Sequence, residues 1–141
     1  MIGPMARRTL ASCFHPWWMV VALLSMGGVI ALTHIPQDVL TRVMHANPHD
    51  KIEHVVAYGV VAALLLLSLR RPVPWVLLLA LLCALAAVGA LDEMTQPLVK
   101  RQASFLDYAA DLVGIAGGCL ILLLRSLAAA MFEARDRPTS A

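Results

Sequence analysis

Acidic and histidine side chains are concentrated in two short stretches of this chain. Seven of the nine acidic residues and four of the five histidines fall within residues 34–54 and 92–111. Carboxylates and imidazoles at such density can exchange protons or hold a divalent cation, and nearby arginine or lysine can bind phosphate. The composition of these stretches predicts a polar site, and the spacing within them indicates how it is built.

Several of these polar residues are four positions apart, a spacing that places them on one helix face. The series are Asp50–His54–Tyr58, Asp92–Gln96 and Asp107–Asp111. Ala110, Gly114 and Gly118 form a small-x-x-x-small series, which lets a neighbouring helix approach closely. We therefore expect Asp111 to face the interior of a helix bundle, with three helix ends presenting polar faces to a common place.

The side chains also divide by chemical role. Arg101 offers a planar fork suited to phosphate, and His54 titrates near neutral pH and can carry a proton. Asp92 or Asp107 would act as a base or ligate a divalent cation. The predicted catalytic residues are Asp92, Asp107 and His54, and the predicted substrate-binding residues are Asp50, Lys51, Glu93, Gln96, Arg101, Ser104 and Asp111.

The composition of the whole chain predicts a membrane environment for this site. Of its 141 residues 60% are hydrophobic and only 14% are charged, with a mean hydropathy of +0.78. A soluble domain carries about 25% charged residues. The net charge of +2 gives no basis for binding nucleic acid. Three cysteines without a C-x-x-C pattern argue against a disulfide framework or a thiolate metal site.

Four stretches are apolar enough to cross a bilayer, which takes about 20 residues. We predict an all-α integral membrane protein, a four-transmembrane-helix bundle with spans at about 17–33, 52–69, 75–91 and 106–124. Trp17 and Trp18 would anchor the first span at the interface, and this span is a signal anchor because no A-x-A pattern follows it. The four-helix domain covers 17–130, between an N-terminal segment, 1–16, and a tail, 131–141, predicted to be disordered.

The distribution of Lys and Arg predicts the orientation of the spans. Seven basic residues lie on the side of both termini and four on the other side. Both termini are therefore expected in the cytoplasm of a multi-pass protein of the bacterial inner membrane. The polar site would then lie at the outer face. Placing an Asp side chain at membrane depth costs about 2.5–3.5 kcal/mol, and this cost is usually offset by a partner or a water-filled cavity.

Four motifs resemble the VanZ-like family, small bacterial membrane proteins named after a member linked to resistance to the glycopeptide teicoplanin. They are His34-Ile35-Pro36, Asp50-Lys51-x-x-His54, Asp92-Glu93-x-x-Gln96 and Arg101-x-x-Ser104-x-x-Asp107-x-x-x-Asp111-x-x-Gly114. The resemblance covers about residues 30–122. It implies a helical membrane fold in the cell envelope and implies no particular reaction. In that setting a polyprenyl phosphate or lipid-linked cell-wall precursor is the expected ligand, with a divalent cation as a possible bridge to its phosphate.

Other interpretations of the same residues remain open. Asp107 with Arg101, or Asp50 with Lys51, can simply tie helix ends together, in a structural or partner-binding protein without catalysis. His45 and His49 are spaced like zinc ligands, but Pro48 between them favours a solvated loop. Ser104, His54 and Asp107 can be drawn as a nucleophilic triad, although Ser104 fits an N-cap of the fourth span better.

Overall fold

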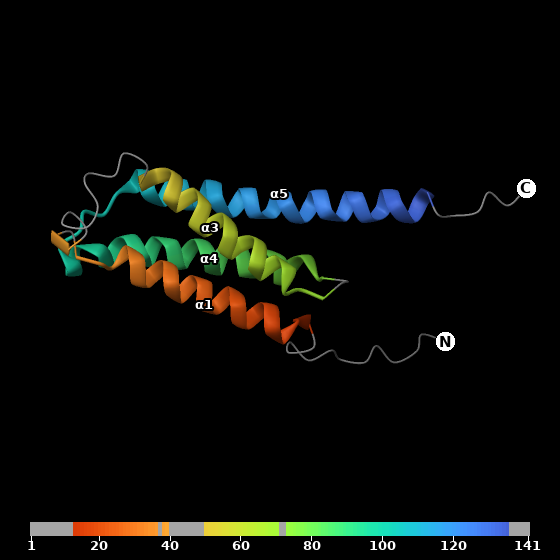
Figure 1. The fold of residues 1–141 in the computed structure, drawn as a ribbon, viewed down its shortest axis with the longest axis horizontal. Coiled ribbons are helices and arrows are strands. Elements are labelled where there is room, and N and C mark those ends of the chain that lie inside the picture. The colour runs from red at the N-terminus through yellow and green to blue at the C-terminus, as the bar shows by residue number, and fades with distance from the viewer. Residues whose placement is uncertain (1–12, 37, 40–49, 71–72, 136–141) are drawn as a thin grey trace, which may run out of the picture.

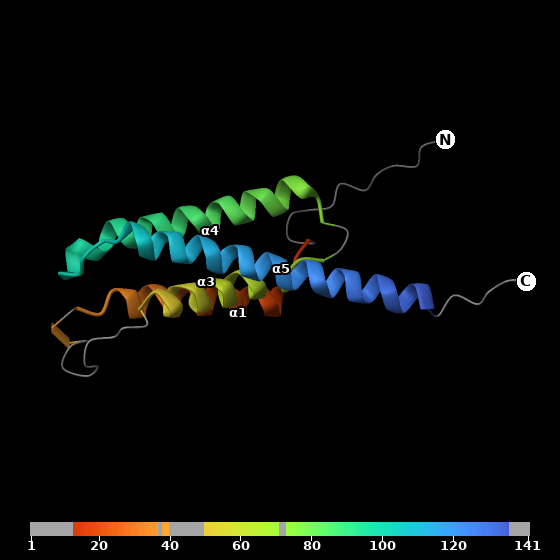
Figure 2. The same ribbon diagram turned by 90° about the horizontal axis from the view of Figure 1, so that it is seen from above.

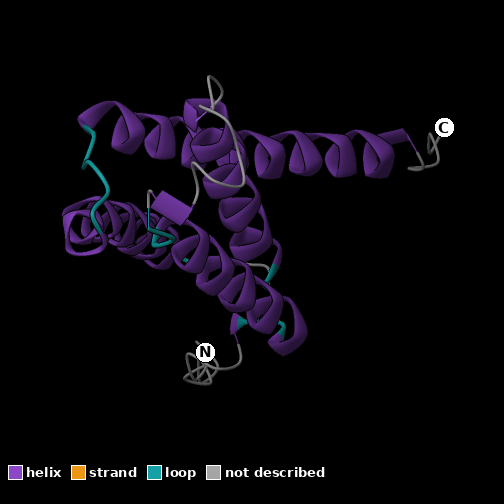
Figure 3. Cartoon of the chain, turned by 60° about the vertical axis from the view of Figure 1, so that its left-hand side comes forward, coloured by secondary structure: helices purple, strands orange, loops and turns teal. Residues whose placement is uncertain are grey.

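The computed structural model describes residues 13–36, 38–39, 50–70 and 73–135 of the chain. Its elements are α1 (Pro16–Thr33), α3 (Asp50–Leu67), α4 (Trp75–Thr95), the 3-10 helix η2 (Gln96–Val99) and α5 (Phe105–Arg135). Figure 3 shows that the described chain is built of helices, and no β-strand occurs within the described ranges. The prediction of an all-α fold is confirmed.

Three of the helices are long and apolar enough to cross a membrane. They are Pro16–Thr33, Trp75–Val99 and Phe105–Ala128. The remaining long helix, α3, has three charged residues, Asp50, Lys51 and Glu53, in its first turn. The chain is therefore a multi-pass membrane protein surrounded by lipid.

Two helices extend beyond the predicted spans. Helix α4 continues past residue 91 to Thr95 and so includes Asp92 and Glu93. Helix α5 continues past residue 124 to Arg135. No proline or glycine interrupts residues 119–135, and Leu, Ala, Met, Glu and Arg favour helix there. The prediction that the disordered tail begins at 131 is wrong for residues 131–135, and 136–141 lie outside the described residues.

The long helices run along one direction and reverse it from one to the next, as Figures 1 and 2 show. The end of α1, the start of α3, the end of α4 and the start of α5 gather at one end, here called the polar end. At the opposite end, His15 donates its backbone N–H to Ser68 at 2.6 Å, and Arg70 donates to Cys13 at 2.8 Å. These two hydrogen bonds place the start of α1 beside the end of α3.

The closest packing is between α3 and α5. A Cβ added at Gly114 would lie 2.9 Å from the Gly59 nitrogen, and one at Gly118 would lie 2.6 Å from the Ala62 Cβ. Both distances are shorter than van der Waals contact, so only glycine fits there. The predicted small-x-x-x-small contact is confirmed, and α3 is the helix that uses it. A small apolar core that includes Tyr58 surrounds the crossing.

Candidate functional site

The centre of the polar end is a buried pair between α3 and α5. His54 Nδ1 lies 2.8 Å from Asp111 Oδ1, and the two side chains are 6% and 0% exposed. The prediction that Asp111 faces the bundle interior is confirmed. An ionised Asp111 favours the imidazole tautomer with its proton on Nδ1, which leaves Nε2 as an acceptor. This is the arrangement in which a histidine acts as a base or a metal ligand.

A second pair lies nearer the surface on the same two helices. Lys51 Nζ donates to Asp107 Oδ1 at 2.7 Å. This hydrogen bond raises the pKa of Lys51, so the ammonium stays charged throughout the physiological range. Ser104 Oγ accepts from the Asp107 backbone N–H at 3.3 Å, which makes Ser104 the N-cap of α5. The N-cap prediction for Ser104 is confirmed, and its hydroxyl points to the backbone rather than to His54.

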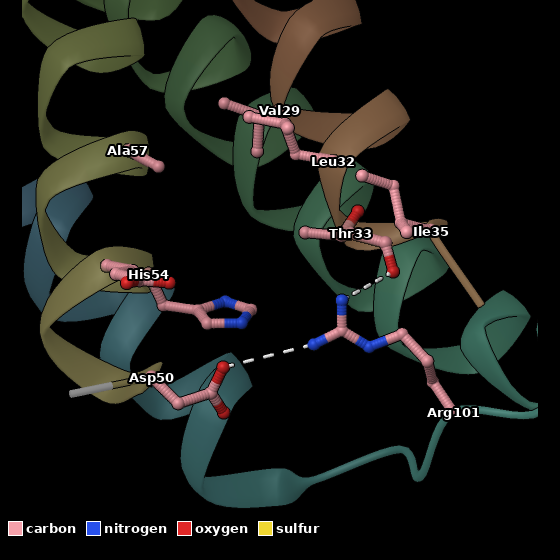
Figure 4. A pocket seen from close by; sticks show the side chains of 9 residues that line it. Val29, Leu32, Thr33, Ile35, Asp50, His54, Ala57 and Arg101 are labelled. Carbon is pink, nitrogen blue, oxygen red and sulfur yellow. Dashed lines mark hydrogen bonds and ion pairs between the residues drawn. The ribbon is translucent and has the colours of Figure 1, made fainter. Parts of the chain in front are cut away.

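Arg101 lies between α1 and α3, as Figure 4 shows. Its Nη1 donates to the Thr33 backbone oxygen at 3.1 Å, and its Nη2 is 3.9 Å from Asp50 Oδ1. The chain reaches this position through Lys100, which has a left-handed φ of 61°, and the Arg101 N–H then bonds back to the Gln96 oxygen at 3.2 Å.

The ion pairs differ from those expected. The alternative that was left open named Asp107 with Arg101 and Asp50 with Lys51, but Lys51 pairs with Asp107 and Arg101 faces Asp50. Residues adjacent in sequence are about 100° apart around a helix, so Asp50 and Lys51 point in different directions. The pairs that the structural interpretation named therefore have their partners exchanged.

Glu93 is buried at the end of α4 and accepts a hydrogen bond from the connection that precedes α5. Gln96 Nε2 donates to Glu93 Oε1 at 2.9 Å, and the Ser104 backbone N–H donates to Glu93 Oε2 at 2.8 Å. Both Glu93 and Gln96 are buried. These bonds hold the carboxylate in one orientation beside His54 and Asp111.

Asp92 joins α4 to the end of α1. Its Oδ1 accepts from Thr33 Oγ1 at 2.8 Å and lies 3.3 Å from His34 Nδ1. His34 Nε2 lies 3.0 Å from Thr95 Oγ1 on α4. Asp92 is thus buried in a network with α1. Thr33 and Thr95 did not enter the predicted site, and their only sequence signal is a hydroxyl at the end of an apolar run.

A cavity of about 290 Å³ opens between α1 and α3 at the polar end. It is lined by Val29, Leu32, Thr33, Ile35, Asp50, Glu53, His54, Ala57 and Arg101. Figure 4 shows the His54 ring and the Arg101 guanidinium pointing into this space. One wall is apolar and one end is polar and charged, a combination suited to an amphiphilic ligand. Of the predicted site residues, Asp50, His54 and Arg101 line the cavity.

Two sets of three side chains come close enough to share a cation. They are Asp50 with His54 and Asp107, and His54 with Glu93 and Asp111, each set offering ligand atoms within 4.8 Å of one another. His54 belongs to both. Four of the predicted site residues, Asp50, Glu93, Asp107 and Asp111, therefore lie around His54. His45 and His49 lie outside the described residues, so the structure gives no answer on a zinc site there.

The comparisons with known proteins add no identity to this geometry. Neither a family model, nor a curated protein, nor a solved structure matches the chain. The fold and the site define a class: a helical multi-pass membrane protein with a buried polar centre and an amphiphilic cavity at one end of the bundle.

Proposed function

We propose that this chain is a four-span, VanZ-like protein of the bacterial inner membrane, in which α3 also crosses the membrane, from Ile52 onward. The hydrogen bonds of Ser68 and Arg70 support this, because they bring the end of α3 to the start of the membrane helix α1. Arg101 bridges the other ends of the same two helices. A helix that contacts a membrane-spanning neighbour at both of its ends is expected to cross the membrane beside it.

We further propose that the cavity binds or modifies a lipid-linked phosphate of the polyprenyl or cell-wall precursor type. The observation that carries this proposal is the position of Arg101 at the polar end of a cavity with an apolar wall. Its Nη2 is 3.9 Å from Asp50, beyond hydrogen-bonding distance. This nitrogen is therefore available to donate to a phosphate oxygen, while the bond from Nη1 to Thr33 keeps the fork in place.

The remaining lining residues suit the rest of such a ligand. Val29, Leu32 and Ile35 offer an apolar surface for a hydrocarbon chain. Asp50 can accept hydrogen bonds from the sugar or amide groups of a precursor. His54, oriented by Asp111, presents a nitrogen that can accept a proton from an attacking hydroxyl or donate one to the phosphate. Binding of the precursor on which teicoplanin acts would contribute to glycopeptide resistance.

A structural function is the second candidate, and specific bonds favour it. The Lys51–Asp107 pair ties the start of α3 to the start of α5, and the bond from the Ser104 N–H to Glu93 ties the connection before α5 to α4, both without any ligand. A protein of this kind needs neither the open Nη2 of Arg101 nor a cavity beside it. The two functions therefore differ in whether removing the Arg101 charge changes binding or only stability.

Native mass spectrometry of the protein in a mild detergent tests the lipid proposal. We expect a co-purified anionic lipid on the wild type and on Lys100→Asn, and its loss from Arg101→Gln. Lys100 is an adjacent exposed cation outside the cavity, and asparagine tolerates its left-handed φ. Equal lipid occupancy in the two variants, or none in the wild type with polyprenyl phosphate added, would overturn the proposal and favour the structural function.

A further inference from the structure

We propose that a divalent cation binds in the buried space between α3, α4 and α5, held by His54 through Nδ1, by Glu93 and by Asp111. The ion takes the place of the proton that His54 Nδ1 otherwise shares with Asp111 Oδ1 at 2.8 Å. The three side chains are 6%, 6% and 0% exposed. Each offers a ligand atom within 4.8 Å of the other two. Two atoms bound to one metal at about 2.1 Å lie at most about 4.2 Å apart. Small side-chain rotations are therefore enough to close the site.

Unpartnered polar atoms beside this cluster are a second and independent observation. Tyr58 Oη and Asp111 Oδ2 are fully buried, and neither has a hydrogen-bond partner among the described residues. A Cβ built at Gly89 would lie 3.3 Å from Asp111 Oδ2 and 3.5 Å from the ring carbon that carries the Tyr58 hydroxyl. The free oxygen and the free hydroxyl thus lie against the same residue of α4. Polar groups this deeply buried ordinarily have a partner.

The balance of charge around the cluster also favours a cation. Lys51 is bonded to Asp107, and Arg101 lies between Thr33 and Asp50. In the described part of the chain, the only ion-pair partner of this kind beside Glu93 and Asp111 is the His54 imidazole, which is neutral when Nε2 is an acceptor. Two buried carboxylates beside one histidine are stabilised by a bound divalent ion, which supplies the missing charge.

The donor set and its surroundings indicate the kind of ion. One imidazole nitrogen with carboxylate oxygens suits a first-row ion such as Mn²⁺, since carboxylates favour Mn²⁺ and imidazole also ligates first-row metals. Each Glu93 oxygen accepts one hydrogen bond and keeps a lone pair, and these bonds orient the carboxylate. The set of Asp50, His54 and Asp107 is less suitable as a cation site. Asp107 is already paired with Lys51, and the Asp50 side chain is 39% exposed.

Titration with Mn²⁺ tests the site directly. The full chain, purified in detergent and stripped with a chelator, is titrated with MnCl₂ while the free ion is followed by electron paramagnetic resonance. We expect one tight Mn²⁺ per chain in the wild type and binding at least about tenfold weaker in Glu93→Gln and Asp111→Asn. Asp50→Asn should bind as the wild type does, which separates the two sets.

The outcomes are decisive because folding is measured on the same samples by circular dichroism and gel filtration. Asp111→Asn keeps an oxygen that can accept the hydrogen bond from His54. Should this variant fail to fold, the Mn²⁺ affinity of Glu93→Gln alone tests the site. No tight Mn²⁺ on the folded wild type would overturn the proposal. So would a loss of binding in Asp50→Asn while Glu93→Gln binds normally. No lipid takes part in this titration, so the result is independent of the proposed lipid function.

Discussion

Replacing Gly114 with alanine should push α3 away from α5 and destabilise the protein. The new Cβ would lie 2.9 Å from the Gly59 nitrogen and closer still to the Val55 carbonyl oxygen. Ordinary van der Waals contact begins near 3.4 Å. Both neighbours are backbone atoms and cannot rotate away, so the two helices have to separate locally by about half an ångström or more. Gly114 is one turn from Asp111, so the same shift would lengthen the bond to His54.

The size of the effect follows from overpacking. An extra methyl group in a close-packed interior costs about 1–3 kcal/mol. Gly117 gives the matched control, because a Cβ there meets nothing within 4 Å. Gly117→Ala should leave the free energy of unfolding unchanged or raise it by up to about 1 kcal/mol, through better helix propensity. Both variants can be unfolded with sodium dodecyl sulfate in mixed micelles and followed by circular dichroism. Equal stabilities for the two variants would refute the close α3–α5 contact.

Two further predictions concern the polar end and the orientation. His54→Ala leaves the Asp111 carboxylate buried without its partner, so the same unfolding assay should give a loss of about 3–5 kcal/mol; a loss below about 1 kcal/mol would mean that the pair is not buried. Green fluorescent protein fused to either terminus should fluoresce, and alkaline phosphatase inserted at residues 100–104 should be active. The reverse pattern would contradict the proposed orientation with cytoplasmic termini.

The helical periodicity of the sequence was enough to predict which side chains share a buried helix face. The four-residue spacing of Asp107 and Asp111 predicted a shared buried face, and both side chains are buried. Gly114 and Gly118 predicted a close helix contact because small residues permit it. These inferences succeeded because each depends on the geometry of one helix, which is the same in every fold.

The pairing between helices could not be predicted in the same way. His54 pairs with Asp111 rather than with Asp107, and Lys51 pairs with Asp107 rather than with Asp50. Which of two carboxylates one turn apart meets a given cation depends on the relative height and rotation of α3 and α5. The Gly59–Gly114 contact sets this relative height and rotation. The spacing of residues along α5 does not indicate which residue of another helix lies opposite.

The hydrogen bonds that α1 makes at the polar end could not be predicted from the sequence either. Thr33 contributes its hydroxyl to Asp92 and its backbone oxygen to Arg101. A threonine at the end of an apolar helix is common and carries no signal of such contacts. The length of α5 was misjudged for a different reason, because bilayer thickness limits an apolar span but does not end a helix whose residues still favour one.

We proposed that the α1–α3 cavity recognises a lipid through its phosphate. Comparing the binding of two lipids that differ only in the phosphate tests this most directly. The purified protein in nanodiscs is titrated with a polyprenyl phosphate and with the matching polyprenol, which has the same chain and no phosphate. We expect the wild type and Lys100→Asn to bind the phosphate form at least about tenfold more tightly than the alcohol, and Arg101→Gln to bind both alike. Equal affinity of the wild type for the two lipids would contradict it.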